Sequence, residues 1–406
     1  MKVMFFNTIY YPYSVGGAEK SVQLLAEELY QQGHTPIVVC SAEEDKIEIL
    51  NGVKVYYVAH RNVYWFQNSK KESSIKRLSW HAKDIYNPSM ADKLKEIILK
   101  ENPDIAHTNN IGGLSAAPWV LCKKYKIPVV HTIRDYNLLC PKSTMFKSGK
   151  NCINRCFECK SLTSLKRFLV NNNYVSHVVG ISQAVIDTHK KYGYFKDTPS
   201  TRIFNGIKLK NISEKQNALN EIGTVKKELK FLYLGRLEKT KGVELILEVF
   251  NYLCREYNCQ LLLGGRVNDE EIATKIDSKY YHPNIKFLGF VNPDDIIPKT
   301  DVMIIPSLWN EPFGRVVIEA YSHNKPVIGA NRGGIPEIIK ENESGYVFDP
   351  DKPEQLQAII VNILNNPGIL NELSLSIPVF LEEFNNTKIV QKYVEIYDLY
   401  NRRDKK

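Results

Sequence analysis

The sequence predicts an α/β protein with two domains, each built on a doubly wound parallel sheet. Short apolar runs alternate with amphipathic stretches, which is the pattern of β-α-β units. The pattern stops near residue 205 and starts again, and 406 residues are enough for two domains. A composition of 43% hydrophobic and 24% charged residues excludes a disordered or fibrous protein. Ligands of such folds bind at the carboxyl ends of the strands.

The first half contains the elements of a Rossmann-like domain, which we expect to span residues 1–204. Lys2–Asn7 is an apolar run that predicts a strand, and Ala18–Gln32 has apolar residues at helical spacing. Further strands are predicted at 36–40, 53–58, 105–108, 128–133 and 178–181, and further helices at 91–100 and 114–125.

The second half repeats this rhythm after a polar stretch at 208–227, which we interpret as a linker. We expect this second domain at 205–385, followed by a last segment at 386–406. Its strands are predicted at 231–235, 261–265, 285–288, 302–305, 326–329 and 346–348.

Positive charge is concentrated in the first half. Residues 1–200 carry 27 Lys and Arg against 17 Asp and Glu, and the rest of the chain is nearly neutral. Such a domain attracts phosphates on a nucleic acid, an anionic membrane or a lipid-linked acceptor. No apolar run approaches the ~20 residues that cross a bilayer, and the start of the chain predicts a strand rather than a signal peptide. We therefore expect a cytoplasmic protein.

The segment Ile304–Ile335 carries a pair of carboxylates. Pro312 suits the first position of a helix, which makes Glu311 a cap and places Glu319 about 12 Å further along the helix axis. The exposed backbone amides at such a helix start favour an anion between the two carboxylates. These amides belong to Phe313, Gly314 and Arg315. A sugar, a diphosphate and a ribose fit this spacing.

Three motifs together resemble glycosyltransferase family 4. They are E-P-F-G-x4-E-A at 311–320, L-G-R-L-x3-K-G at 234–242 and G-G-I-P-E at 333–337. The resemblance implies the GT-B fold, with two Rossmann-like domains facing across a cleft, and transfer that retains the anomeric configuration of the donor sugar. It also implies that the last helix, around 388–401, returns to the first domain.

The resemblance implies roles for two cations and both carboxylates. Arg236 and Lys241 would hold the donor diphosphate and stabilise the leaving group, so no cofactor is expected for catalysis. Glu311 would bind the transferred sugar, and Glu319 the ribose. Considered singly, the cations could be surface residues and the carboxylates solvated helix side chains.

Two further pairs extend the resemblance to both domains. Backbone groups of Phe290 and Val291 would line the base pocket, although Phe290 could equally pack in the core. Gly16 and Gly17 suit close approach of a phosphate or sugar to the backbone, or a simple loop. They lack the spacing of the glycines in dinucleotide-binding proteins, which counts against a dehydrogenase.

The strand at 128–135 departs from the family, which usually has a histidine near the reacting sugar. Arg134 stands at that place, and His131 points to the opposite face because side chains alternate along a strand. We expect Arg134 to contact the donor sugar or an acceptor phosphate, with a structural salt bridge, for instance to Asp135, as the alternative. His107 is a further candidate, either for the site or for the core.

Four cysteines in the loop 140–159 form the second departure. A tetrahedral zinc site would order a segment with little core of its own, and its role would be structural. An iron–sulfur cluster or free thiols are the alternatives. The four are Cys140, Cys152, Cys156 and Cys159.

Two segments, 61–83 and 160–170, mix cations with large apolar residues such as Trp65 and Trp80. This mixture suits an anionic membrane surface, although each could be a helix with a buried apolar face. No nucleic-acid-reading motif accompanies the charge, so we expect no nucleic-acid partner.

The sequence therefore predicts a retaining glycosyltransferase, peripheral on the inner face of the cell membrane. It would move a sugar from a nucleotide-diphosphate sugar to a lipid-linked or polysaccharide acceptor. A catalytically silent sugar-nucleotide-binding partner of a glycan assembly complex and a nucleotide-sugar epimerase are the alternatives.

Overall fold

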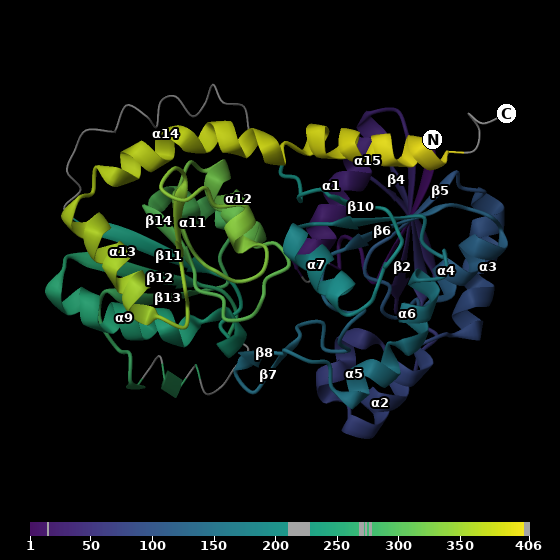
Figure 1. The fold of residues 1–406 in the computed structure, drawn as a ribbon, viewed down its shortest axis with the longest axis horizontal. Helices are drawn as coiled ribbons and strands as arrows, with labels where there is room; N and C mark the ends of the chain where they lie inside the picture. The colour runs from purple at the N-terminus through teal and green to yellow at the C-terminus, as the bar shows by residue number, and fades with distance from the viewer. Residues whose placement is uncertain (14–15, 210–227, 268–271, 273, 276–277, 402–406) are drawn as a thin grey trace. The chain divides into compact units, whose positions relative to one another are not determined.

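A computed structural model describes residues 1–13, 16–209, 228–267, 272, 274–275 and 278–401, and divides the chain into two compact units (Figure 1). Unit 1 comprises the described residues of Met1–Met145, Ile153–Gly206 and Asn386–Lys406. Unit 2 comprises Phe146–Cys152 and the described residues of Ile207–Asn385. Most of the predicted linker, residues 210–227, lies outside the described residues.

Unit 1 is built on an eight-stranded sheet in the order β10-β9-β6-β5-β1-β2-β4-β3. Every neighbouring pair is parallel except β3 and β4. The order reverses between β1 and β5. The strands are β1 (Lys2–Asn7), β2 (Thr35–Ala42), β3 (Lys46–Leu50), β4 (Val53–Ala59), β5 (Ile105–Thr108), β6 (Val129–Ile133), β9 (His177–Gly180) and β10 (Ser200–Arg202).

Helices cover this sheet, with α1 packed on α15 and α3 packed on α4 (Figure 1). The last helix, α15, is tied to α1 because the Asn386 side chain donates a hydrogen bond to the Leu24 carbonyl at 3.0 Å. The helices are α1 (Gly17–Gln31), α2 (Ser74–Lys83), α3 (Pro88–Glu101), α4 (Ala117–Lys124), α5 (Phe157–Leu162), α6 (Ser164–Val170), α7 (Gln183–Lys191) and α15 (Asn386–Tyr400).

Unit 2 has a six-stranded sheet in the order β13-β12-β11-β14-β15-β16, and all its neighbouring pairs are parallel. This is the strand order of a doubly wound nucleotide-binding fold, and it reverses between β11 and β14. The strands are β11 (Leu229–Leu234), β12 (Cys259–Gly264), β13 (Ile285–Gly289), β14 (Val302–Ile305), β15 (Val327–Ala330) and β16 (Gly345–Phe348).

In unit 2, α9 packs on α13 and α12 packs on α14 (Figure 1). The apolar stripes of α9 and α13 pack against the sheet in one core, in which Phe231 and Phe250 are fully buried with ring centroids 5.2 Å apart. The helices are α9 (Val243–Glu256), α11 (Pro293–Ile296), α12 (Arg315–Ser322), α13 (Pro353–Asn365) and α14 (Ile369–Leu381).

The predicted strands of both halves are confirmed to within two residues. The sequence did not predict β3, which is antiparallel, or the short strand β10. It also placed all of 1–204 in the first domain, whereas the hairpin β7 (Phe146–Lys147) and β8 (Lys150–Asn151) belongs to unit 2. Within the described residues, no helix is both long and apolar enough to cross a membrane.

Candidate functional site

The candidate site lies where the strand order of unit 2 reverses. Lys241 follows β11 in the 3-10 turn Lys239–Lys241, and Glu311 follows β14. The Lys241 Nζ forms an ion pair with the Glu311 carboxylate, which also accepts a hydrogen bond from the Ser307 hydroxyl at 2.9 Å. The neighbouring carboxyl ends of β11 and β14 thus bring together two residues that are 70 positions apart. Open α/β sheets bind ligands at this kind of point.

The electrostatics of the pair keep Glu311 ionised. Burial by itself would raise the pKa of the Glu311 carboxyl, but Lys241 and the Ser307 hydroxyl hold this pKa below its ordinary value. The Lys241 ammonium also lies 5.0 Å from the centroid of the buried Trp309 ring, a cation–π contact. The site therefore presents a fixed anion beside a fixed cation.

Two motif glycines are required by close backbone packing at the site. Gly242 has φ of +71°, and a Cβ there would lie 1.8 Å from the Pro306 carbonyl oxygen. Gly333 has φ of +59°, and a Cβ there would lie 2.1 Å from the Glu311 carbonyl oxygen. That carbonyl accepts a hydrogen bond from the Gly334 amide at 2.7 Å. Only glycine fits both positions, which explains these residues in the two motifs.

The helix after Glu311 begins later than predicted. Pro312 is not its first residue and Glu311 is not its cap, because α12 begins at Arg315 with Gly314 as its cap. Gly314 has φ of +93°, a left-handed conformation that separates the residues before it from the helix. Phe313 and Gly314 therefore precede the first turn of the helix, and Glu311 reaches the site from the loop after β14.

Glu319 lies in the middle of α12 and is held by Arg315. The Arg315 Nε donates a hydrogen bond to the Glu319 Oε1 at 3.1 Å. This pairing at i and i+4 fixes the direction of both side chains on one face of the helix. Whether Glu319 binds a ribose stays a prediction.

Arg236 and Phe290 follow β11 and β13 and are both exposed. Arg236 Nη2 lies 3.1 Å from the Glu238 carboxylate, with 55% of its side chain exposed. Phe290 is 75% exposed, so it is not a core residue, and its ring centroid lies 5.0 Å from the Arg266 guanidinium. Val291 is half-buried and packs close to Gly264. Arg266 was not among the residues predicted from the sequence, although its place just after the apolar run of β12 is a signal that could have found it.

In unit 1, Gly16 and Gly17 open α1 after β1. The Gly16 amide donates a hydrogen bond to the Glu19 carboxylate at 2.9 Å. Gly16 has φ of −164°, which any residue adopts, and a Cβ there would meet Glu19 only at 3.6 Å. Neither backbone conformation nor crowding within unit 1 therefore requires a glycine at position 16.

Arg134 is buried at the carboxyl end of β6. Its Nε donates to the Asn109 side-chain oxygen and its Nη1 to that of Asn205, both at 2.7 Å. The contact with a donor sugar or acceptor phosphate stays a prediction.

The histidines named by the sequence analysis are core residues. His107 is fully buried and hydrogen-bonded to Tyr397 at 2.6 Å and to Thr132 at 2.7 Å, so it joins β5 to α15. His131 is buried between Trp119 and Phe195, and burial lowers its pKa to about 3. Both side chains are neutral at physiological pH and serve the packing of unit 1.

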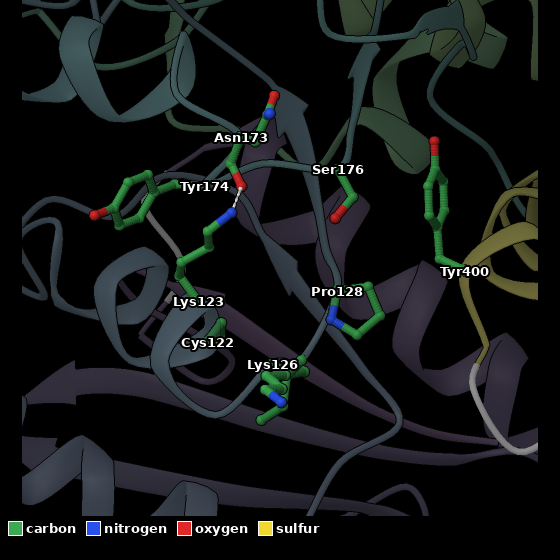
Figure 2. A pocket seen from close by; sticks show the side chains of 9 residues that line it. Cys122, Lys123, Lys126, Pro128, Asn173, Tyr174, Ser176 and Tyr400 are labelled. Carbon is green, nitrogen blue, oxygen red and sulfur yellow. Dashed lines mark hydrogen bonds between the residues drawn. The ribbon is translucent and has the colours of Figure 1, made fainter.

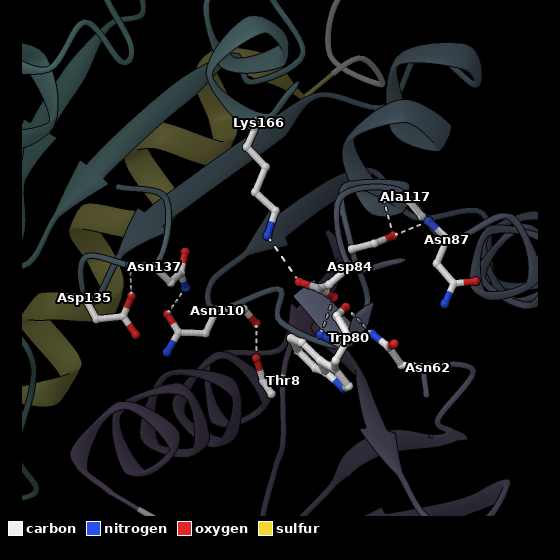
Figure 3. A network of polar contacts seen from close by, with 12 residues as sticks. Thr8, Asn62, Trp80, Asp84, Asn87, Asn110, Ala117, Asp135, Asn137 and Lys166 are labelled. Carbon is white, nitrogen blue, oxygen red and sulfur yellow. Dashed lines mark hydrogen bonds and ion pairs between the residues drawn. The ribbon is translucent and has the colours of Figure 1, made fainter. Parts of the chain in front are cut away.

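Polar residues follow the central strands of unit 1 (Figure 3). Asp135 accepts a hydrogen bond from the Asn137 amide at 2.7 Å, and the Asn137 side chain donates to that of Asn110 at 3.3 Å. Thr8 donates to the Asn110 carbonyl at 3.0 Å. Burial, together with the Glu19 carboxylate, raises the pKa of Asp135 to about 7. The sequence indicates Asp135 only as a salt-bridge partner of Arg134, so this network of polar residues could not be predicted from it.

The cysteine-rich loop is divided between the units. Cys140, Cys156 and Cys159 belong to unit 1, whereas Cys152 belongs to unit 2. Burial and the neighbouring thiols of Cys156 and Cys140 raise the pKa of Cys159. Over the described residues, no group of three or more His, Cys, Asp or Glu is placed to hold a metal ion. The zinc site stays a prediction.

A separate pocket of about 330 Å³ lies in unit 1 (Figure 2). Pro128 and Ser176, which line it, precede β6 and β9, so the pocket lies at the amino ends of these strands. Lys123 in its wall donates to the Asn173 carbonyl at 3.0 Å. We assign it no part in the site, because ligands of doubly wound sheets bind at the opposite edge.

The chain resembles known proteins over nearly its full length. Residues 15–211 match Glycosyltransferase Family 4, and residues 214–375 match Glycosyl transferases group 1. The chain is 34% identical to an uncharacterised 42.6 kDa protein in the cps region of Klebsiella pneumoniae, over 98% of this chain and 100% of the relative.

Solved structures share the fold, and two of them cover nearly the whole chain. Sucrose-phosphate synthase from Thermosynechococcus elongatus aligns with a TM-score of 0.77 at 18% identity, over 98% of each chain. HepE from Anabaena, in complex with UDP and glucose, aligns with a TM-score of 0.72 at 18% identity, over 98% of this chain and 99% of that one.

The two parallel-sheet units and these matches define a glycosyltransferase of the GT-B type. The chain belongs to glycosyltransferase family 4, with a second half of the glycosyl transferases group 1 kind.

Proposed function

We propose that this protein is a retaining glycosyltransferase that moves a sugar from a nucleoside diphosphate sugar to a lipid-linked or polysaccharide acceptor. The observation that carries the proposal is the Lys241–Glu311 pair at the point where the strand order of unit 2 reverses. The helices α9 and α12 begin shortly after the two loops that hold this pair, and helix amino ends favour the negative charge of a diphosphate.

The donor would occupy the carboxyl ends of the unit 2 strands. Lys241 and Arg236 would neutralise the diphosphate, and Glu319 would accept hydrogen bonds from the ribose hydroxyls. Glu311 stays ionised beside Lys241, so its carboxylate can accept hydrogen bonds from the hydroxyls of the transferred sugar. Phe290 with Arg266 offers an exposed stack beside which a nucleobase could lie.

In the reaction, the bond between the anomeric carbon and the diphosphate oxygen breaks while the acceptor oxygen bonds to the same face of that carbon. The acceptor proton passes to the departing phosphate oxygen. This step depends on stabilising the leaving group, which Lys241 and Arg236 would do. No cofactor is needed for it, so we expect brief EDTA treatment to leave the rate unchanged.

Two similarities guide the choice of substrates. The HepE structure contains UDP and glucose, so UDP-sugars are the first donors to test. The Klebsiella relative comes from a cps region, which suggests a capsule-type polysaccharide or its lipid-linked precursor as the acceptor.

The direct experiment is a donor panel of UDP-glucose, UDP-galactose, UDP-N-acetylglucosamine and GDP-mannose, with release of the nucleoside diphosphate as the readout. We expect turnover with at least one donor, and NMR should show an α-configured product from an α-configured donor. Lys241→Ala should abolish turnover, whereas Lys239→Ala, which changes an exposed lysine of the same turn, should not. Donor binding without turnover would identify the silent binder, and a β-configured product would refute retention.

We also propose that unit 1 docks on an anionic membrane near the two predicted segments, but through a surface of apolar side chains other than Trp65 and Trp80. Trp65 and Trp80 are only 7% and 8% exposed, so they do not form it. Five other apolar side chains of α2, α5, α6 and the adjoining residues are exposed. They are Ile75, Leu78, Ile153, Phe157 and Phe168, with exposed fractions from 54% to 85%.

These helices form one region of unit 1, because Lys166 of α6 forms a buried ion pair with Asp84, just after α2, at 3.3 Å (Figure 3). Exposed cations accompany the apolar side chains, for example Lys76, Arg77 and Lys160. A surface of this composition suits an anionic lipid headgroup layer.

Sedimentation with vesicles tests the surface. We expect binding to phosphatidylglycerol vesicles and none to phosphatidylcholine vesicles. The double variant Ile75→Ser/Phe157→Ser should lose binding to phosphatidylglycerol vesicles. Ile49→Ser, at a 74% exposed position of β3, should keep it. Equal binding by all three proteins, or no binding by the wild type, would refute this surface.

A further inference from the structure

The hairpin β7–β8 is a well-defined element of unit 2, although the residues on either side of Phe146–Cys152 belong to unit 1. Phe146 pairs with Asn151 and Lys147 with Lys150. Its two turn residues, Ser148 and Gly149, have φ of +52° and +76°. Two positive φ values in a two-residue turn match the twist of a tight hairpin, so the turn fixes which residues face each other.

Asn151 at the end of this hairpin binds the loop that carries Glu311. Its side-chain Nδ2 donates to the Leu308 carbonyl at 2.8 Å, and its Oδ1 accepts from the Asn310 amide at 2.9 Å. One side chain thus satisfies a backbone acceptor and a backbone donor two residues apart, as a neighbouring strand would do. Both ends of the amide are needed, because each makes a different bond.

The same loop is held from the other end by the turn that carries Lys241. The Thr240 carbonyl accepts hydrogen bonds from the amides of Leu308 and Trp309, at 2.9 and 3.2 Å. The backbone between Leu308 and Asn310 is therefore fixed by Thr240, which precedes Lys241, and by Asn151.

We propose that Asn151 is a positioning residue for Glu311, supplied to the donor site by a segment inserted within the first half of the chain. This inference rests on the proposed function. Asn151 fixes the backbone of Asn310, and the next residue is Glu311, whose carboxylate must meet the sugar. Loss of the Asn151 amide leaves the hydrogen bonds of Thr240 to the loop intact, but frees the Leu308 carbonyl and the Asn310 amide, which precedes Glu311.

The kinetics of Asn151 variants distinguish a positioning role from a purely structural one. Glu311 would contact the sugar, whereas the nucleotide is held by other groups. Loss of Asn151 should therefore lower kcat while leaving the affinity for the nucleoside diphosphate unchanged. A purely structural role would lower the melting temperature and leave the kcat of the folded protein as it is.

The experiment compares Asn151→Ala, Asn151→Asp and the control Lys150→Ala, whose side chain is exposed in the same hairpin. With the donor turned over by the wild type in the panel, we expect kcat of Asn151→Ala to fall about ten-fold, the effect of losing one or two hydrogen bonds. Asn151→Asp keeps the shape of the side chain and the hydrogen-bond acceptor but loses the hydrogen-bond donor, so its kcat should fall as far. The dissociation constant of the nucleoside diphosphate of that donor, UDP or GDP, should stay within about two-fold of wild type. Unchanged kcat in both Asn151 variants, or an equal fall in Lys150→Ala, would overturn the proposal.

Hydrogen exchange of the Asn310 amide tests the contact with Asn151 without the need for catalytic turnover. The peptide that contains Asn310 should exchange faster in Asn151→Ala than in the wild type or in Lys150→Ala, because its amide loses a partner. If the wild type turns over no donor, the proposed function fails while faster exchange still supports the contact with the Glu311 loop. Unchanged exchange at Asn310 overturns the inference whatever the activity.

Discussion

The Lys241 ammonium and the Glu311 carboxylate form an ion pair that joins the loops after β11 and β14. These two strands are neighbours in the sheet although other strands and helices separate them in sequence. Because the strand order reverses between them, their loops diverge and leave room for a ligand beside the pair. The pair is therefore both a structural link and the centre of the candidate donor site.

Removal of Lys241 should destabilise unit 2 in a pH-dependent way. Glu311 has a pKa below its ordinary value of 4.5, so it contributes stability above that value, and this stability is lost as the pH falls through the lowered pKa. We expect Lys241→Ala to lower the free energy of unfolding by about 1–3 kcal/mol at pH 7.

Urea unfolding at pH 7 and pH 4 measures this effect. The difference between Lys241→Ala and wild type should shrink at pH 4, because the stability contributed by the paired Glu311 carboxylate starts to be lost once the pH falls below the ordinary pKa of 4.5. Lys239→Ala provides the control at both pH values. A difference that stays the same or grows at pH 4 would contradict the account.

Substitution of Gly333 should damage the site through its backbone. In Gly333→Ala the new Cβ would collide with the Glu311 carbonyl, so the loop must move. Gly289→Ala is a matched control, because Gly289 also has a positive φ, +67°, but nothing lies within 4 Å of its Cβ position. Gly289→Ala should lower the free energy of unfolding by about 1 kcal/mol and keep its activity. Gly333→Ala should lower the free energy of unfolding by more than this and lose transferase activity. Equal effects of the two substitutions on stability and activity would refute the collision.

The pKa of Asp135 makes the stability of unit 1 depend on pH in the opposite direction. A pKa raised from 3.8 to about 7 means that the folded state holds a proton that the unfolded state has released. Stability is then present at low pH and falls as the pH rises from about 4 to about 7. Asp135→Asn removes this titration, so its stability relative to wild type should increase by roughly 2–3 kcal/mol as the pH rises from 5 to 8.

Melting temperatures of Asp135→Asn across pH 5–8 check this expectation. Asp92→Asn, which changes an exposed carboxylate of α3, should show no such divergence. A stability relative to wild type that falls between pH 5 and pH 8 would show that the ionised Asp135 is stabilised by its neighbours.

The sequence located the sheets because buried parallel strands are short apolar runs, which the β11 and β14 segments show clearly. It did not locate the start of α12, because the left-handed conformation of Gly314 is not encoded by helical periodicity. The motifs placed Lys241 and Glu311 at strand ends, and the structure shows why they meet there.

Other features could not be predicted because they depend on distant contacts. The link between Asn151 and Leu308 spans 157 residues and follows no local pattern. Trp80 resembled a membrane-facing aromatic in the sequence, but it is buried and its Nε1 donates to the Tyr64 carbonyl at 3.1 Å. His107 likewise lies in the core through its contact with α15.

Metal analysis of anaerobically purified protein tests the cysteine-rich loop. The sequence-based hypothesis of a structural zinc predicts one zinc per chain, lost in Cys156→Ser and Cys159→Ser. Cys122→Ser, at a buried cysteine of α4, should keep the metal. Because Cys152 belongs to unit 2, Cys152→Ser shows whether a ligand comes from that segment. Protein without stoichiometric metal would refute the zinc site.

Calorimetric titration with UDP, GDP and ADP tests the central claim most directly, namely that unit 2 holds a nucleoside diphosphate beside Lys241 and Glu319. The account predicts that at least one of these nucleotides binds the wild type. It further predicts that Lys241→Ala and Glu319→Ala each weaken this binding at least ten-fold while Lys239→Ala does not. Failure of all three nucleotides to bind, or equal binding by every variant, would contradict it.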